Sequence, residues 1–406
     1  MIESIKELIK AHTNIEKEVY LDIENSAPVP EEVVAEMLPY FNKRAYGNPT
    51  LTHKLGWEAY ETIILSAKKI GEYVGVESPE EINFTPGETE ANNLAILGIC
   101  LNRKNHGKKI VVSEIEPLNV INVCKMLEEL GFKVEKVPVD REGFIKIERL
   151  KEKVDKNTVL ASFALVNNEI GTVQPMKEVF ETVKDINFNT IFHVDLSDAY
   201  GRIPFDVKKV PVELATISSN KILGPKGVGA LYVKEGLKIE RILEGQIGTQ
   251  KLWPGIENTP AIVGFAKASE LAFKNFEYNI NHMKKLRDRL IEEILNNIEG
   301  SVLNGPKGDK RSPDNVNISF LKCEGESLTI ELSLKGVYVS SGSACTRRVL
   351  QPSHVLTAIG RRFEEAHGSI LMKVTRYHNM DDIEYVLKVL PEAVNRLRKI
   401  YGTMGE

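Results

Sequence analysis

Short apolar runs alternate with amphipathic stretches along the middle of the chain. Several runs between residues 81 and 234 are apolar enough to be buried strands: "EINFT", "KIVVSE", "TVLASFALV", "TIFHVDL", "LATISS" and "GALYVK". Between them lie stretches with helical periodicity, such as "PLNVINVCKMLEELGF" and "MKEVFETVKDI". This alternation predicts an α/β fold whose mainly parallel sheet is covered by helices on both faces. The site of such a sheet lies at the carboxyl ends of its strands.

The pattern changes after about residue 261. A long polar helix is predicted from about Tyr278 to Ile298, and it is followed by the strands "VNISFL" and "VYVSSG" and by a last helix, "MDDIEYVLKVLPEAVNRLRKI". We therefore predict a large domain over residues 16–261 and a smaller α+β domain formed by residues 1–15 together with 262–406.

Composition and charge narrow the class of protein. A chain of 406 residues is too long for one small core, which agrees with two domains. The net charge of -4 argues against a nucleic acid or a membrane surface as the main partner. No run approaches the ~18 apolar residues of a membrane span, and the start, "MIESIKELIKAHTN", has the pattern of a charged amphipathic helix without an apolar signal core. The cysteines form no CxxC pair, which argues against a metal site and fits a reducing cytoplasm.

Three strand ends carry residues that suit one cofactor. Asp195 lies near the end of "TIFHVDL", Lys221 ends "LATISSNK", and the strand "INFT" passes through Gly87 into a helix that opens with Glu88 and Thr89. A strand–glycine–helix junction offers free N–H groups and a positive dipole end to a phosphate. A carboxylate can hold a protonated pyridine nitrogen, and a lysine can form an imine. Each residue alone has a simpler interpretation, as a helix cap or a surface lysine, but together they predict a site for pyridoxal phosphate.

A Ser/Gly-rich stretch, "VSSGSACTRRVLQPSHVL", carries a candidate nucleophile, Cys345. Its small residues imply a mobile loop, and the charges of Arg347 and Arg348 favour the reactive thiolate. Ser353 is predicted to cap a helix that begins near His354. A lone cysteine is otherwise a buried and inert thiol, which is the prediction for the remaining cysteines, Cys100, Cys124 and Cys323.

With these motifs in this order, the chain resembles the NifS/IscS-type cysteine desulfurases, in the class V aminotransferase group of fold-type I pyridoxal-phosphate enzymes. The resemblance covers nearly the whole chain. It is strongest in "YGNPTLTHKLGWEA", "FTPGETEANNLAI", "VNNEIGTVQP", "ISSNKILGPKGVGALYV", "ENTPAIVGFAKA" and "SSGSACT". It implies a homodimer with active sites at the subunit boundary, and a small amino acid as the substrate.

The resemblance also implies roles for particular residues. The family's functional positions fall on Lys221 for the imine, Asp195 for the pyridine nitrogen, Thr89 and Ser218 for the phosphate, Asn168 for a ring contact and Cys345 for the persulfide. In the implied mechanism, cysteine displaces Lys221 from the imine and the freed lysine moves a proton. Cys345 then takes the substrate sulfur, which leaves alanine and a persulfide for delivery to an acceptor protein.

Departures from the family's motifs cluster around the substrate. The family's ring-stacking histidine, ring-hydroxyl glutamine, "SSHK" histidine, inter-subunit threonine and carboxylate-binding arginine fall on Pro117, Asp198, Asn220, Ile256 and Leu371. "LDIENSAP" also replaces the family's "LDNNATTP" in a substrate-facing loop. We expect Asp198 and Asn220 to contact the cofactor in place of the missing groups, and cofactor retention to be weaker than in typical members.

Leucine at position 371 cannot bind a carboxylate, so another cation would have to replace the family's arginine. Side chains alternate along a strand, so Lys373 shares the side of Leu371 whereas Arg376 does not. We therefore predict Lys373 as a looser substrate contact. Three functions stay open at this point: a desulfurase or a relative that mobilises sulfur or selenium, a lyase or transaminase acting on another amine, and a non-catalytic sulfur-relay or scaffold protein. Retention of both Lys221 and "SSGSACT" favours the first.

Overall fold

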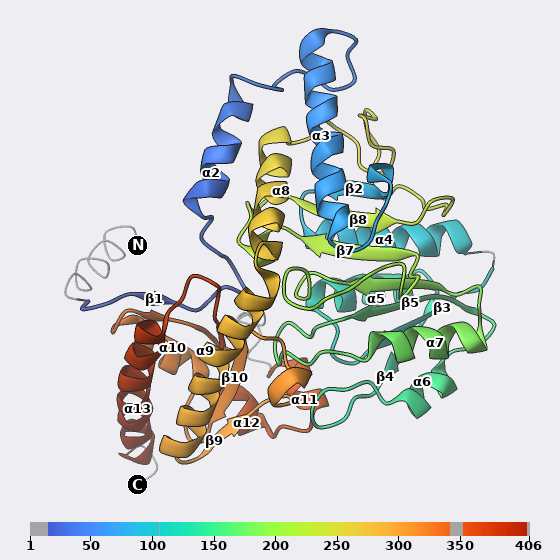
Figure 1. Ribbon diagram of the computed structural model, residues 1–406. Helices are drawn as coiled ribbons and strands as arrows, with labels where there is room; N and C mark the ends of the chain where they lie inside the picture. Colours follow the sequence, from blue (N-terminus) through green and yellow to red (C-terminus); the bar gives the residue numbers. More distant parts are fainter. Residues whose placement is uncertain (1–14, 105, 342–351, 404–406) are drawn as a thin grey trace.

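The computed structural model describes residues 15–104, 106–341 and 352–403 (Figure 1). The predicted amino-terminal helix lies outside the described residues, as do Cys345, Arg347 and Arg348. Within the described ranges, none of the helices has both the length and the apolar character that a membrane span needs.

A mainly parallel sheet of seven strands forms the centre of the larger unit. In chain order the strands are β2 (Ile82–Thr85), β3 (Lys109–Ser113), β4 (Lys133–Val137), β5 (Thr158–Ala164), β6 (Ile191–Asp195), β7 (Leu214–Ser218) and β8 (Gly229–Val233). Their order across the sheet is β2-β8-β7-β6-β5-β3-β4. Only β8 runs antiparallel to its neighbours, β2 and β7. The α/β fold with a mainly parallel sheet is therefore confirmed.

Helices cover both faces of this sheet because successive strand residues point to opposite sides. On one face, α4 (Glu88–Arg103) and α5 (Leu118–Glu129) pack on residues such as Ile110 and Val112. On the other face, Val111 lies in a core with residues of α3 (Lys54–Glu72), α6 (Ile147–Lys153), α7 (Met176–Ile186) and α8 (Thr259–Phe273). The short helices α2 (Glu31–Met37), η1 (Leu38–Phe41) and η2 (Pro79–Glu81) complete this unit.

A smaller antiparallel sheet organises the rest of the described chain. Its order is β12-β13-β10-β9, from β9 (Ser301–Leu303), β10 (Asn315–Phe320), β12 (Ser340–Ser341) and β13 (Ser369–Lys373). It shares one core with α9 (Phe276–Asn297), α10 (Gly325–Ser333) and α13 (Met380–Thr403). The remaining elements are η4 (Gly308–Lys310), α11 (His354–Ala358), α12 (Phe363–His367) and the parallel pair β1 (Val19–Tyr20) and β11 (Val337–Tyr338). The long polar helix and the late strands lie close to their predicted positions.

The hydrophobic cores of the larger and the smaller sheet divide the chain slightly differently from the predicted domains. Helix α8 continues past residue 261, and its buried residues Ile262, Phe265 and Ala268 pack in the core of the larger sheet. Val19, near the start of the described chain, packs in the core of the smaller sheet. By packing, residues 262–272 thus belong with the larger unit, because α8 is one continuous apolar helix. The division into two domains itself stays a prediction.

Candidate active site

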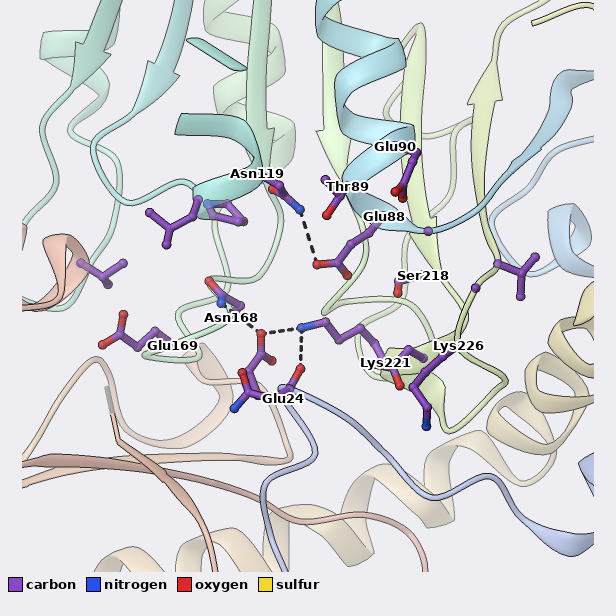
Figure 2. Close-up of a pocket in the computed structure, with 18 of the residues that line it drawn as sticks. Glu24, Glu88, Thr89, Glu90, Asn119, Asn168, Glu169, Ser218, Lys221 and Lys226 are labelled. Atoms are coloured by element: carbon purple, nitrogen blue, oxygen red, sulfur yellow. Dashed lines mark hydrogen bonds and ion pairs between the residues drawn. The ribbon is translucent and has the colours of Figure 1, made fainter. Parts of the chain in front are cut away.

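A cavity of about 440 Å³ opens at the carboxyl ends of the parallel strands. Segments that are far apart in the sequence line it: the loop after β1, the junction between β2 and α4, the start of α5, and the loops after β5 and β7. Helix α11, whose Val355 and Leu356 pack in the core of the larger sheet, closes one side. Figure 2 shows that most of the labelled side chains point toward the centre of this cavity. The site therefore lies where a parallel sheet places it, between the two units.

One end of the cavity suits a phosphate. Strand β2 runs into Gly87, and α4 begins at the next residue, so backbone N–H groups of its first turn have no partner within the helix. A Cβ atom on Gly229 of β8 would lie 2.7 Å from the carbonyl carbon of Gly87, so only glycine lets this strand approach the junction. Thr89 and Ser218 line the same cavity (Figure 2). As predicted, the sequence brings these donors together.

Asp195 is fixed at the end of β6. The side-chain amide of Asn92 on α4 donates to Oδ2 of Asp195 at 2.7 Å, and the backbone N–H of Ser197 donates to Oδ1 at 2.8 Å. Burial raises the pKa of Asp195, and these hydrogen bonds oppose the rise. Because both oxygens are held, the carboxylate has one orientation, as a partner of a cationic ring nitrogen requires.

Glu88, the first residue of α4, also points into the cavity (Figure 2). The amide nitrogen of Asn119 lies 3.5 Å from its Oε1, and its Oε2 is buried without a partner among the described residues. Burial raises the pKa of the Glu88 carboxyl to about 7, although the charge of Lys221 opposes the rise. Near neutral pH the side chain is therefore protonated in a large fraction of molecules and can donate a hydrogen bond to a ligand.

Lys221 lies in a one-turn helix, η3 (Asn220–Ile222), directly after β7. The next turn is tight, since Leu223 adopts a left-handed conformation with φ 69°. The Lys221 ammonium donates to the Glu24 carboxylate and, at 3.2 Å, to the Glu24 carbonyl oxygen, and it lies 3.5 Å from Oδ2 of Asp198. Burial alone would lower the pKa of Lys221, but the charges of Asp198 and Glu24 hold it well above its usual range. Without a cofactor, this lysine is a buried ammonium.

Lys373 joins the same group of charges. Its ammonium contacts the Asp198 carboxylate and lies 2.5 Å from Oε2 of Glu24. We call Glu24, Asp198, Lys221 and Lys373 the buried ion cluster; its two positive and two negative charges balance. Asn168 adds a neutral donor, since its side-chain amide bonds Oε1 of Glu24 at 3.0 Å. Lys373 thus lies near Lys221, but two carboxylates hold its ammonium, and its role as a substrate contact stays a prediction.

The positions that depart from the family's motifs lie in several places. Pro117 and Asn220 line the cavity, and the Asn220 side chain accepts a hydrogen bond from the backbone N–H of Ala27 at 3.3 Å. Leu371 is buried in the middle of β13. Ile256 is 71% exposed and lines a separate, smaller cavity. The replaced residues therefore lie around the cavity, in β13 and at a second cavity, whereas Thr89 and Ser218, the donors for a phosphate, are kept.

Some residues of the site were not predicted. Glu24 was missed because it lies far from Lys221 in the sequence, and only the change to "LDIENSAP" marked its loop. Asn92 could have been found, because it is a fully buried polar residue on a helix, one turn after Glu88 and Thr89. His354 was predicted only to open α11, but its Nε2 lies 2.9 Å from the carbonyl oxygen of Glu116, at the wall of the cavity. The predicted cap is confirmed, since the Ser353 side chain accepts from the backbone N–H groups of α11.

The described cysteines lie away from the cavity, and all of them are buried: Cys100, Cys124 and Cys323. Burial raises the pKa of the Cys124 thiol to about 12, and burial also raises that of Cys100. A buried thiol that stays protonated is a poor nucleophile. This agrees with the prediction that these cysteines are structural.

The donors and acceptors of the cavity match the parts of pyridoxal phosphate. The first turn of α4, with Thr89 and Ser218, can bind the phosphate. The oriented carboxylate of Asp195, at the end of β6, is the candidate partner of the ring nitrogen. Lys221 lines the same cavity and carries the amine that an aldehyde would need. The charge of Glu88 opposes the fit, but with a pKa of about 7 the carboxyl is neutral in a large fraction of molecules near neutral pH. The residues present therefore fit this cofactor.

Comparisons with known proteins agree with this geometry. Residues 19–386 match the family model "Aminotransferase class-V". The chain is 44% identical over 381 residues to "Cysteine desulfurase IscS 1" of Archaeoglobus fulgidus. The match covers 94% of this chain and 98% of the relative. The chain is also 43% identical over 385 residues to "Cysteine desulfurase IscS" of Methanosarcina thermophila, with 95% and 94% covered.

Solved structures give the same result. A "NifS-like protein" superimposes with a TM-score of 0.87 at 34% identity and covers 94% of this chain and 100% of its own. A structure described as "SspA in complex with cysteine" superimposes with a TM-score of 0.77 at 29% identity, with 89% and 99% covered. From the match over most of its length, the chain belongs to the class V aminotransferase family, among the cysteine desulfurases of the NifS/IscS type.

Proposed function

We propose that this protein is a pyridoxal-phosphate-dependent cysteine desulfurase that moves sulfur from a cysteine substrate to Cys345. The observation that carries the proposal is the placement of Lys221, which is buried in one cavity with the open amino terminus of α4 and follows the strand next to the one that Asp195 ends. The family and the named relatives support the same activity.

Each residue has a defined task in this proposal. Thr89, Ser218 and the first turn of α4 bind the phosphate, and Asp195 keeps the ring nitrogen protonated. When bound, the cofactor supplies an electron sink for the carbon next to the substrate amine. Lys221 holds the cofactor before substrate arrives and afterwards moves a proton at that carbon, which its position in the cavity allows.

The sulfur step balances without an external oxidant. The Cys345 thiolate attacks the substrate sulfur and forms a disulfide-type S–S bond. The carbon–sulfur bond breaks, its electron pair stays with carbon, and that carbon takes a proton. Alanine and a Cys345 persulfide result, and the persulfide is then available to a sulfur-acceptor protein.

The proposal is tested first by the cofactor's visible absorption. Purified protein is expected to be yellow, or to become yellow with added pyridoxal phosphate, and the absorption band is expected to shift when L-cysteine is added. Cysteine without protein, and protein with L-valine, serve as controls. A protein that stays colourless after addition of the cofactor would contradict the assigned function and favour a scaffold role.

We also propose that the protein is a homodimer. Helices α2, η1 and α3 project from the body of the larger unit (Figure 1) and expose large apolar side chains. The most exposed of these are Leu38, Phe41, Trp57 and Leu65, each between 58% and 62% exposed. Such a surface is typical of a protein interface, and a second copy that covers it would agree with the homodimers implied by the resemblance.

Light scattering after size-exclusion chromatography checks the dimer. The expected mass is twice the 45.5 kDa of one chain, and the double substitution Leu38→Glu with Phe41→Glu is expected to produce monomers, because it places two charges in the apolar contact. A wild-type mass of 45.5 kDa at micromolar concentration would exclude the homodimer.

A further inference from the structure

A carboxylate of the protein itself already lies in front of Lys221. Oε1 of Glu24 accepts hydrogen bonds from Lys221 and from Asn168, the latter at 3.0 Å, and Oε2 lies 2.5 Å from the Lys373 ammonium. Figure 2 shows Glu24 pointing from the opposite wall toward the tip of Lys221. Two ammonium groups and one amide therefore make a complete carboxylate site, and Glu24 fills it.

The substrate must bring its amine to the same place. In the proposed function the substrate amine takes over the bond that Lys221 makes to the cofactor. In a free α-amino acid, the carboxylate is attached to the carbon that carries this amine, so it would enter beside Glu24. Two carboxylates that share a partly desolvated site repel each other, because the low effective dielectric weakens screening.

No spare cation compensates for this repulsion among the described residues that line the cavity. Lys226 is the only lining lysine besides Lys221, and its ammonium donates to the carbonyl oxygen of Ala27 at 3.2 Å. Both partners of Lys373 are carboxylates, those of Glu24 and Asp198. The resemblance implies an arginine at position 371, but the leucine found there has no charge. The charges of the buried ion cluster therefore balance before a substrate arrives.

We propose that Glu24 selects a cysteine whose carboxyl group is an amide, as in the amino-terminal cysteine of a peptide or protein, over free cysteine. The inference rests on the proposed function and specifies its substrate. An amide is neutral, and its N–H can donate to Glu24 instead of repelling it. The amine and the thiol are unchanged, so the carbon–sulfur bond still breaks, the sulfur still forms an S–S bond with Cys345, and an alanyl amide remains.

Binding of sulfur-free analogues tests the inference apart from turnover. L-serine and L-serinamide are titrated into the cofactor-loaded wild type, and binding is followed by calorimetry and by the visible band of the cofactor. Affinities are compared at equal concentrations of unprotonated amine, because the two amines differ in basicity. Serinamide is expected to bind at least about tenfold more tightly than serine, which corresponds to about 1.4 kcal/mol.

Two variants assign the preference to Glu24. Glu24→Gln keeps the size of the side chain and removes the charge, so the preference for serinamide is expected to fall to about threefold or less. Glu72→Gln removes the same charge from the exposed face of α3, and the preference should stay as in wild type.

Equal or tighter binding of serine by wild type, no binding of serinamide, or an unchanged preference in Glu24→Gln would overturn the inference. The comparison of serine with serinamide in the wild type tests the inference even if Glu24→Gln does not fold. Failure of the desulfurase proposal is a separate outcome: no persulfide would form from either cysteine or cysteinamide, while the preference between the serine compounds could still hold.

Discussion

Replacing Lys221 by alanine is expected to lower the rate of alanine formation from a cysteine substrate by at least about a thousandfold. The substitution removes both the covalent attachment of the cofactor and the group that moves the proton. It also leaves Glu24 and Asp198 with Lys373 as their only ammonium partner in the buried ion cluster. The rate is measured as alanine released, and the retained cofactor as visible absorption after gel filtration.

Lys177→Ala provides the matched control. Lys177 lies on α7 with its side chain 71% exposed, so its loss should change neither the colour nor the rate. If Lys221→Ala kept a tenth or more of the wild-type rate, another residue would have to carry the chemistry, and the assignment of Lys221 would be wrong.

Replacing Lys373 by methionine is expected to lower the free energy of unfolding by about 3–5 kcal/mol, because removal of one partner leaves a buried charge uncompensated. Lys373 is only 2% exposed, and both of its partners are carboxylates of the buried ion cluster. Methionine keeps the length of the side chain, so the loss reports mainly on the charge. Urea denaturation of the cofactor-free protein measures it, since cofactor binding would otherwise contribute to stability.

An exposed ion pair provides the control for Lys373→Met. Lys335 lies 2.8 Å from Glu392, and both side chains are at least 36% exposed. Lys335→Met should change the stability little, because water screens such pairs. Equal losses from the two variants would show that the buried ion cluster is not the strongly coupled unit that its geometry indicates.

The sequence predicted the residues of the site that lie at strand ends. Asp195 and Lys221 follow adjacent parallel strands, and the register of β6 and β7 pairs Asp195 with Thr216, five residues before Lys221. The alternation of strand and helix determines which ends meet, so periodicity was enough to place both residues at the same edge of the sheet. The same argument placed Gly87 and Thr89 at this edge of the sheet.

Glu24 could not be predicted in this way. It lies in an irregular loop that connects β1 of the smaller unit to the larger one, and no periodic pattern relates it to Lys221 or Lys373. Its position depends on how the two units pack, which follows from long-range contacts. The structure places the Lys373 ammonium against Glu24, which lines the cavity, while the predicted contact to a substrate stays untested. The sequence did not predict that carboxylates of the chain itself form ion pairs with this lysine.

The helix at the predicted domain boundary shows what hydrophobic periodicity cannot predict. The sequence changes character after residue 261, but α8 begins at Thr259 and runs to Phe273 with apolar residues on nearly every side. A helix that is apolar all round is buried, and here α2 and α3 cover it. Periodicity predicts such a helix but not the sheet on which it packs.

Reduction of the cofactor-loaded protein with borohydride, followed by peptide mapping, tests the central claim most directly, because it identifies the lysine that holds the cofactor. We expect the mass of reduced pyridoxal phosphate on the peptide that contains Lys221, at about one group per chain. The lysines nearby, Lys226 and Lys373, should be unmodified. A label on either of these, or no label on a protein that is visibly yellow, would contradict the account of this site.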